Sequence, residues 1–202
     1  MKNIRLTVWI GIMCGWLAAG MLQAGTRPDN ACPAEEDGSR LWLPVMRPAE
    51  GAEVEVIYKG KVSPTIAIAI AELKNAWKGE PVLLEKKRTG QGDGFAITSS
   101  EHQVRILSST EAGLLYGVYS LLRMQAAGQV TVPLSVTEQS VYDLRILNHW
   151  DNPDGTVERG YAGCSLWNWE ELPGTLSPRY EAYARANASV GINGTVLNNV
   201  NA

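Results

Sequence analysis

The chain has 202 residues, enough for one or two domains with a sizeable hydrophobic core. It is mildly acidic, with 18 lysines and arginines, 21 aspartates and glutamates, and a formal net charge of −3. The longest basic run is Lys86–Arg88, a pattern typical of a solvated loop. This charge balance argues against nucleic acid as a partner.

The N-terminal residues differ from the rest of the chain. Lys2 and Arg5 precede an apolar stretch at 6–22, and the small residue Ala24 stands at a suitable cleavage point. This pattern predicts a signal peptide over 1–24. The alternative is an uncleaved anchor, since the apolar stretch is nearly long enough to span a bilayer. The polar residues that follow favour cleavage, so we expect an exported protein, periplasmic or extracellular, without membrane attachment.

Cleavage would leave two cysteines, Cys32 and Cys164, in the mature chain. Export permits a disulfide. However, Cys32 lies in a leader at 25–39 that is rich in proline and acidic residues, and Cys164 lies in a distant loop, so two separate thiols are expected. The cysteines and histidines do not have metal-ligand spacing, and the sequence therefore predicts neither a metal nor another cofactor.

Residues 40–141 have the pattern of a compact α/β domain in which two helices cover one sheet. Turn residues separate short apolar or alternating runs, which is typical of strands. The expected strands lie at 41–46, 54–58, 82–85, 94–98, 104–107 and 130–136.

Two helices are expected in this domain. The first is predicted over 64–78 with Ser63 as its N-cap; its Ile-Ala alternation is ambiguous, and its length and cap favour a helix. The second is strongly amphipathic. It is predicted to open with a capping box formed by Ser108 and Glu111, and to end near Gly128.

Residues 142–202 show a different order of elements, typical of one βαβ unit. Such a unit cannot close a (β/α)8 barrel, which takes about 250 residues. We therefore expect 142–202 to be the truncated beginning of a barrel domain. Its predicted parts are a buried strand at 144–148, a loop at 149–177, a helix at 178–190 and a strand at 195–200.

Polar and aromatic residues follow both strands of this unit. Trp150 and Asp151 follow the first strand, and Asn199 and Asn201 follow the second. Ligands of α/β sheets bind beyond the carboxyl ends of the strands, so these ends form the candidate site. A tryptophan ring also suits the C–H face of a sugar.

Three further residues of the same loop favour structural roles. His149 is interpreted as an imidazole satisfied by hydrogen bonds rather than as a proton carrier. Trp167 and Trp169 are interpreted as aromatic residues that pin the loop to the barrel.

Two long segments closely resemble the xylan α-glucuronidases of glycoside hydrolase family 67. They are LNHWDNPDGTVERGYAGCSLWNWEELP at 147–173 and YARANASVGINGTVLNNVNA at 183–202. A weaker pattern, GLLYGVYSLLRMQ at 113–125, resembles a helix of the small N-terminal domain of that family. The resemblance covers roughly residues 40–202. It implies a small α/β domain, a central (β/α)8 catalytic barrel and a helical C-terminal domain.

The resemblance implies removal of α-1,2-linked (4-O-methyl)glucuronic acid from xylo-oligosaccharides with inversion. In the inverting scheme one carboxylic acid protonates the leaving oxygen and an opposing carboxylate activates water. In the family these carboxylates lie on later barrel strands, so we expect them downstream of Ala202 and expect this chain alone to be inactive. The implied partner is a glucuronoxylan-derived oligosaccharide, and the resemblance allows a homodimeric full-length protein.

By motif position, Trp150 would wall the uronic acid, and Val200 would shape the space around its O4 substituent. The pair Glu158–Arg159 has a second interpretation of equal weight, an internal ion pair that holds the loop. The further candidates for substrate contacts are Asp151, Glu158, Arg159, Asn199 and Asn201.

Two other functions stay open at this point. One is an inactive fragment that acts at most as a carbohydrate-binding or domain-docking module. The other is a different glycosidase, such as a hexosaminidase-like enzyme, that shares the N-terminal domain.

Overall fold

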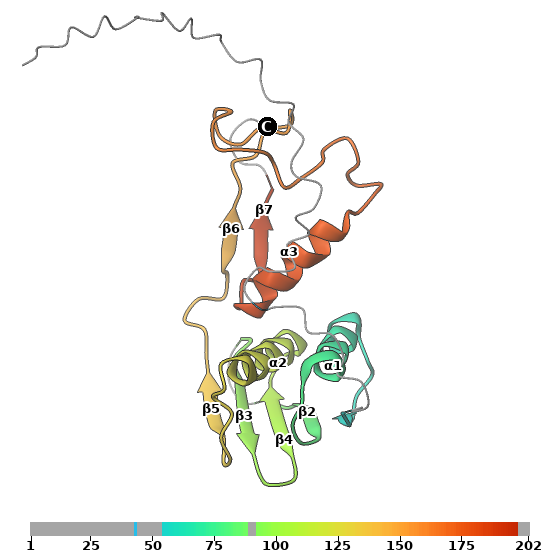
Figure 1. Cartoon of the computed structure of the whole chain (residues 1–202), viewed down its shortest axis with the longest axis vertical. Coiled ribbons are helices and arrows are strands. Elements are labelled where there is room, and N and C mark those ends of the chain that lie inside the picture. The colour runs from blue at the N-terminus through green and yellow to red at the C-terminus, as the bar shows by residue number, and fades with distance from the viewer. Residues whose placement is uncertain (1–42, 44–53, 89–91, 198–202) are drawn as a thin grey trace, which may run out of the picture. The chain divides into compact units, whose positions relative to one another are not determined.

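The computed structural model describes residue 43 and the ranges 54–88 and 92–197 (Figure 1). The predicted signal peptide and leader lie outside these residues, as does the predicted strand at 41–46 apart from Leu43. All described residues belong to one compact unit, 31–202. Within them, no helix has the length and apolar character needed to cross a membrane.

The first part of this unit is a five-stranded mixed sheet with the order β1-β2-β4-β3-β5. Strands β1, β2 and β4 are parallel, and β3 is antiparallel to both β4 and β5. Strands are therefore found for five of the six predicted ranges, four of them with small shifts of their ends. Their bounds are Val56–Tyr58, Val82–Lys86, Phe95–Ser99, Val104–Ser108 and Ser135–Glu138.

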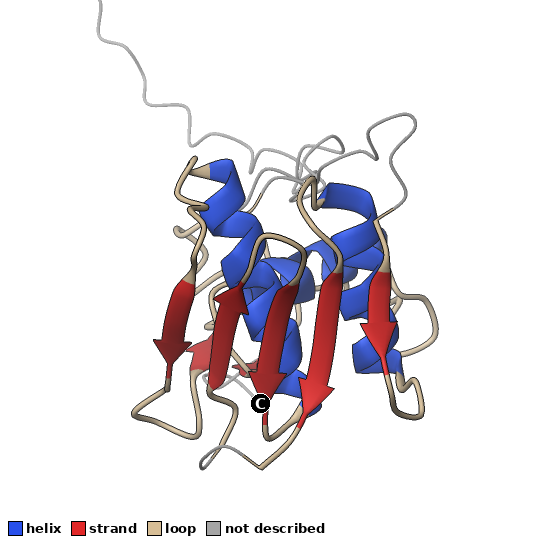
Figure 2. Cartoon of the chain, turned by 90° about the horizontal axis from the view of Figure 1, so that it is seen from below, coloured by secondary structure: helices blue, strands red, loops and turns tan. Residues whose placement is uncertain are grey.

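Helices α1 (Pro64–Ala76) and α2 (Glu111–Ala126) pack on the same face of this sheet, as predicted (Figure 2). The core lies between the two layers, and its innermost side chains are fully enclosed. They include Ile66 and Leu73 of α1, Leu84, Ile97 and Ile106 of the strands, and Leu114, Val118 and Leu121 of α2.

Helix α1 shows how the alternating Ile-Ala sequence is accommodated. The buried positions Ile66, Ala69, Leu73 and Ala76 follow helical spacing, whereas Ile68 is 49% exposed. Ser63 caps the helix as predicted, its hydroxyl accepting a hydrogen bond from the Ile66 amide. The Ile-Ala alternation fits a helix and a strand equally well, and the Ser63 cap and the neighbouring sheet favour the helix.

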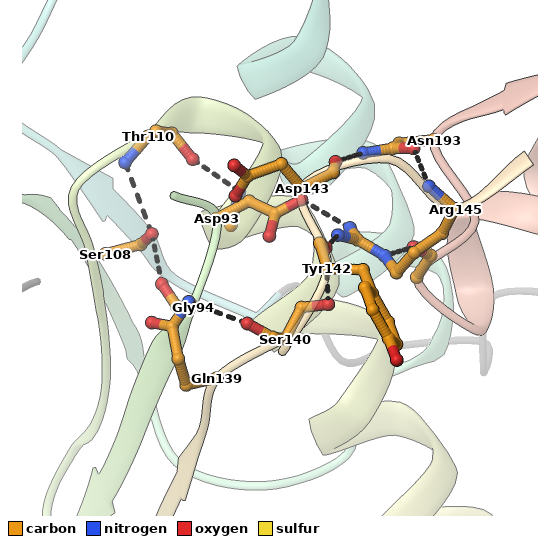
Figure 3. A network of polar contacts seen from close by, with 12 residues as sticks. Asp93, Gly94, Ser108, Thr110, Gln139, Ser140, Tyr142, Asp143, Arg145 and Asn193 are labelled. Atoms are coloured by element: carbon orange, nitrogen blue, oxygen red, sulfur yellow. Dashed lines mark hydrogen bonds and ion pairs between the residues drawn. The ribbon is translucent and has the colours of Figure 1, made fainter. Parts of the chain in front are cut away.

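The predicted capping box of α2 is wrong. Thr110 is the N-cap, and its hydroxyl accepts from the Gly113 amide. Ser108 instead ends β4, and its hydroxyl donates to the Gly94 carbonyl at 2.6 Å (Figure 3). Strand β4 runs one residue further than its apolar pattern and includes Ser108, so the helix is capped by Thr110 instead. The helix ends as expected before Gly128, which has a positive φ of 66°.

The predicted strand at 130–136 is displaced toward the C-terminus. Its last part, β5, runs from Ser135 to Glu138 and pairs with β3. Pro133 has no amide hydrogen for a ladder bond, and Val132 is 58% exposed. The apolar residues before Leu134 therefore form a connection rather than a strand.

The second part is the expected βαβ unit. Strand β6 (Ile146–Asn148) pairs in parallel with β7 (Gly194–Val196), and α3 (Pro178–Ser189) connects them. The prediction that 144–148 is buried is wrong, since Leu144 is 74% exposed and Ile146 47%. Among the described residues β6 pairs with β7 alone, so each strand keeps one unpaired edge, and Ile146, Thr195 and Val196 are exposed.

Arg145 connects the βαβ unit to the sheet domain (Figure 3). Its guanidinium donates to the Asp93 carboxylate at 2.5 Å and to the carbonyls of Tyr142 and Gly191. Its own amide donates to the Asn193 side chain. One side chain therefore joins the loop before β3, the linker after β5 and the turn before β7.

Arg185 of α3 makes a second connection. It forms two hydrogen bonds with the Glu72 carboxylate of α1, at 2.6 and 2.9 Å, and a third with the Leu43 carbonyl. Its guanidinium also lies over the Tyr119 ring. Burial raises the pKa of Tyr119, and the neighbouring Glu72 raises it further. These charged contacts therefore help to hold α3 against α1 and α2.

Candidate functional site

The carboxyl ends of β6 and β7 and the long loop after β6 hold most of the predicted site residues. Residues Asn199, Val200 and Asn201 lie outside the described part of the chain, so their predicted roles stay predictions. The described candidates are Trp150, Asp151, Glu158 and Arg159, all in the loop between β6 and α3.

Trp150 directly follows the strand end and is 49% exposed. Its carbonyl accepts a hydrogen bond from the Glu158 amide at 2.8 Å, which fixes the backbone on both sides of the turn. A large aromatic ring is thus presented to solvent on an anchored backbone. This is the arrangement that stacking on a sugar requires, although sugar contact itself stays a prediction.

Asp151 points the other way and is 2% exposed. One carboxylate oxygen accepts from the Ser165 hydroxyl at 2.5 Å and from the Leu166 amide at 3.2 Å. The other oxygen lies 3.5 Å from Nδ1 of His149. The carboxylate therefore closes the loop by joining its beginning to its middle, and a sugar contact by Asp151 stays a prediction.

His149 is held from three sides. Its amide donates to the Val196 carbonyl of β7, and its Nε2 lies 2.5 Å from the Tyr183 hydroxyl. That hydroxyl is in turn 3.3 Å from the Thr195 hydroxyl. With Asp151 on Nδ1, both ring nitrogens have polar neighbours, which is the satisfied imidazole that the sequence suggested.

Trp167 packs on the same cluster and is 7% exposed. Its ring meets His149 and Tyr183 edge-on, with centroids 5.5 and 5.4 Å apart, and Tyr180 lies at 5.2 Å. These contacts confirm that Trp167 pins the loop. Sequence reasoning missed both tyrosines, although their spacing of three residues on α3 places them on one helix face.

The Glu158–Arg159 pair sits at a turn in which Glu158 has a positive φ of 54°. The Asn152 side chain stabilises this turn by donating to the Glu158 carbonyl at 2.6 Å. A hydrogen bond from Tyr161 to the Glu158 carboxylate raises the pKa of Tyr161. Arg159 is exposed, so its side chain is open to solvent next to Glu158, whose amide bonds to the Trp150 carbonyl.

A metal centre finds no support in the described residues, which contain no group of three or more histidine, cysteine, aspartate or glutamate side chains placed to hold an ion. Cys164 is exposed in the loop, whereas Cys32 lies outside the described range.

Replacing Asp151 with alanine should lower the free energy of unfolding by about 1–3 kcal/mol, because the Ser165 hydroxyl and the Leu166 amide would lose a buried acceptor. Urea unfolding of the chain measures this loss. The matched control is Glu170→Ala in the same loop, at an exposed position. Equal stability of the two variants would contradict the bracing role of Asp151.

Comparison with known proteins gives a match to the glycosyl hydrolase family 67 middle domain over residues 124–202. Proteins named probable alpha-glucuronidase A are similar in sequence: that of Aspergillus clavatus is 41% identical over 111 residues and that of Neosartorya fischeri 44% over 111. Each alignment covers 54% of this chain. The chain spans only 13% of the length of these relatives.

A solved structure, a family GH115 4-O-methyl-alpha-glucuronidase with specificity for decorated arabinogalactans, has a similar fold. The TM-score is 0.50 at 10% identity, covering 72% of this chain and 25% of that one. At this identity the likeness concerns the fold alone. Residues 124–202, which begin within α2 and include the whole βαβ unit, thus match the middle domain of glycoside hydrolase family 67.

Proposed function

We propose that this chain is the N-terminal part of an α-glucuronidase that removes α-1,2-linked (4-O-methyl)glucuronic acid from xylo-oligosaccharides with inversion. The observation that carries the proposal is the family 67 match over 124–202, the segment that holds both strand ends, the anchored loop and Trp150. The general acid and base would be supplied by later strands, as the inverting scheme requires two opposed carboxyl groups.

The proposal assigns different tasks to the two parts of the chain. Residues 40–141 would be the N-terminal domain of the family 67 type, and 142–202 the first βαβ unit of a (β/α)8 barrel. The parallel β6–β7 pair with α3 between them supports the second assignment. The unpaired edges and exposed side chains of β6 and β7 support it also, because a barrel strand pairs with a neighbour on each side. Residues 1–24 would direct export.

The two competing functions are a hexosaminidase-like enzyme and a non-catalytic carbohydrate-binding module. A hexosaminidase-like activity is not favoured, since the matching relatives are named alpha-glucuronidases. A module that binds carbohydrate without cleaving it would share the Trp150 loop and lack turnover, so activity measurements separate it from the proposal.

A chimera tests the proposal. Residues 124–202 would replace the matching segment of the Aspergillus clavatus relative, and the release of 4-O-methylglucuronic acid from aldouronic acids would be measured. We expect the chimera to hydrolyse these substrates and the 202-residue chain alone to leave them intact. Release of the uronic acid by the chain alone, or hydrolysis of N-acetylhexosaminides by the chimera, would contradict the proposal.

Enlarging Val200 to tryptophan in the chimera should lower kcat/KM for the 4-O-methylated substrate about tenfold or more, because overfilling a well-packed wall costs about 1–3 kcal/mol. The unmethylated substrate should lose less. Val200→Ala, which leaves the space open, is the control. An equal loss on both substrates would separate Val200 from the O4 substituent.

A further inference from the structure

A cluster of exposed positive charges lies at one edge of the five-stranded sheet, beyond the carboxyl ends of β1 and β2. These strands are parallel with Tyr58 beside Leu84, so the residues that follow them reach the same edge. We call this cluster the basic edge. It consists of Lys59, Lys61, Lys86, Lys87 and Arg88, all of which are exposed.

Both helices of the sheet domain start at this edge. The Ser63 hydroxyl, which caps α1, donates to the Glu111 carboxylate of α2 at 2.5 Å, and Lys86 pairs with the same carboxylate at 3.1 Å. These hydrogen bonds lower the pKa of Glu111. The contacts place two helix N-termini beside the end of β2. Each N-terminus adds about half a positive charge to the local field.

The charge at this edge is unbalanced. In the part of the chain that the structure describes, Glu111 is the carboxylate paired with one of the five cations, Lys86, whereas the chain as a whole has a net charge of −3. Among the described residues, three further acids lie toward the other half of the edge. The Asp143 carboxylate lies beside Gly92 and near Thr110 at the start of α2 (Figure 3). Asp93 is paired there with Arg145, and Glu138 accepts from the Ser120 hydroxyl. Positive potential is therefore concentrated over β1 and β2.

An aromatic side chain stands beside the first two lysines. The Tyr58 ring lies over Gly60, where a Cβ would come within 2.8 Å of three ring and hydroxyl atoms. Gly60 thus lets the half-buried ring lie against the turn between Lys59 and Lys61. A ring with a hydroxyl, flanked by cations, suits a sugar that carries negative charge.

We propose that the basic edge binds a uronate-bearing stretch of polysaccharide, separately from the site at the ends of β6 and β7. The choice of glucuronoxylan as the ligand rests on the proposed function. The positive charge and the Tyr58 ring are observed independently of it. Neighbouring strands are about 4.8 Å apart, so the five cations share a short surface. Exposed charge contacts are individually weak and act together, which makes the binding sensitive to salt.

Affinity electrophoresis of the 202-residue chain tests this proposal. The chain would run in native gels that contain either glucuronoxylan or xylan freed of its uronic acids. We expect retardation by glucuronoxylan only, and its loss at about 0.5 M salt. The variants Lys59→Gln/Lys61→Gln and Lys87→Gln/Arg88→Gln should each bind about tenfold more weakly.

The matched control is Lys74→Gln/Lys78→Gln, which removes the same charge from exposed positions toward the other end of α1. It should bind glucuronoxylan as the unchanged chain does. Equal weakening in the control, equal retardation by neutral xylan, or tighter binding of single-stranded DNA would each overturn the proposal.

The outcome is independent of hydrolysis. An inactive chimera together with retained, variant-sensitive retardation would remove the proposed function and keep the basic edge. An active chimera together with no retardation would remove the basic edge alone.

Discussion

Replacing Trp150 with alanine in the chimera should lower kcat/KM on aldouronic acids about 30-fold or more. Trp150 presents its ring at the strand end on a backbone fixed by the Glu158 amide, so the ring has little freedom to lose on binding. Removing an aromatic anchor of this kind costs about 2 kcal/mol or more. Steady-state kinetics measure the loss, which should be largest in KM if the ring binds substrate and transition state alike.

Tyr161→Ala is the matched control for this experiment. Tyr161 is an aromatic residue of the same loop, is 75% exposed, and contacts Glu158. Its loss should change kcat/KM by less than threefold, roughly the size of an ordinary surface substitution. If the Trp150 variant keeps the parent's kinetics, Trp150 is not part of the sugar pocket.

Gly113→Ala should destabilise the chain by about 3 kcal/mol, near the upper end of the range for overpacking. In most helices this substitution stabilises by about 1 kcal/mol. Here an added Cβ would lie 2.7 Å from the Asp93 carbonyl and 2.9 Å from the Gly94 carbonyl, and would collide with the Ser108 hydroxyl. Backbone atoms cannot rotate away, so α2 would be forced off the sheet.

Chemical denaturation measures this effect, and Gly174→Ala is its control. A Cβ at Gly174 would meet the Glu171 carbonyl at 3.5 Å, an ordinary contact. This control should shift the unfolding free energy by less than about 0.5 kcal/mol. A stabilised Gly113 variant would show that α2 does not approach the sheet as closely as described.

Local signals in the sequence predict most of the sheet domain. The Ser63 cap, the apolar spacing of α2 and the glycine after it fix both helices to within a few residues. The errors arise where two local options compete. Ser108 suits either a cap or a strand end, and the sheet decides, because the Gly94 carbonyl needs a donor there.

The candidate site is less predictable, because its contacts are distant in sequence. Asp151 is an acidic residue just after a strand, a pattern that predicts a ligand contact. Only the fold places Ser165 and Leu166 against its carboxylate. The contact between His149 and Tyr183 depends in the same way on how α3 returns to β6. The exposure of Trp150, in contrast, agrees with the interpretation drawn from its place at a strand end.

The most direct test is a crystal structure of the chimera with an aldouronic acid bound. The account predicts that the uronic acid ring lies against the face of Trp150 and beside Val200, beyond the carboxyl end of β6. A sugar bound elsewhere, with Trp150 facing only solvent or enclosed without a neighbouring cavity, would contradict it.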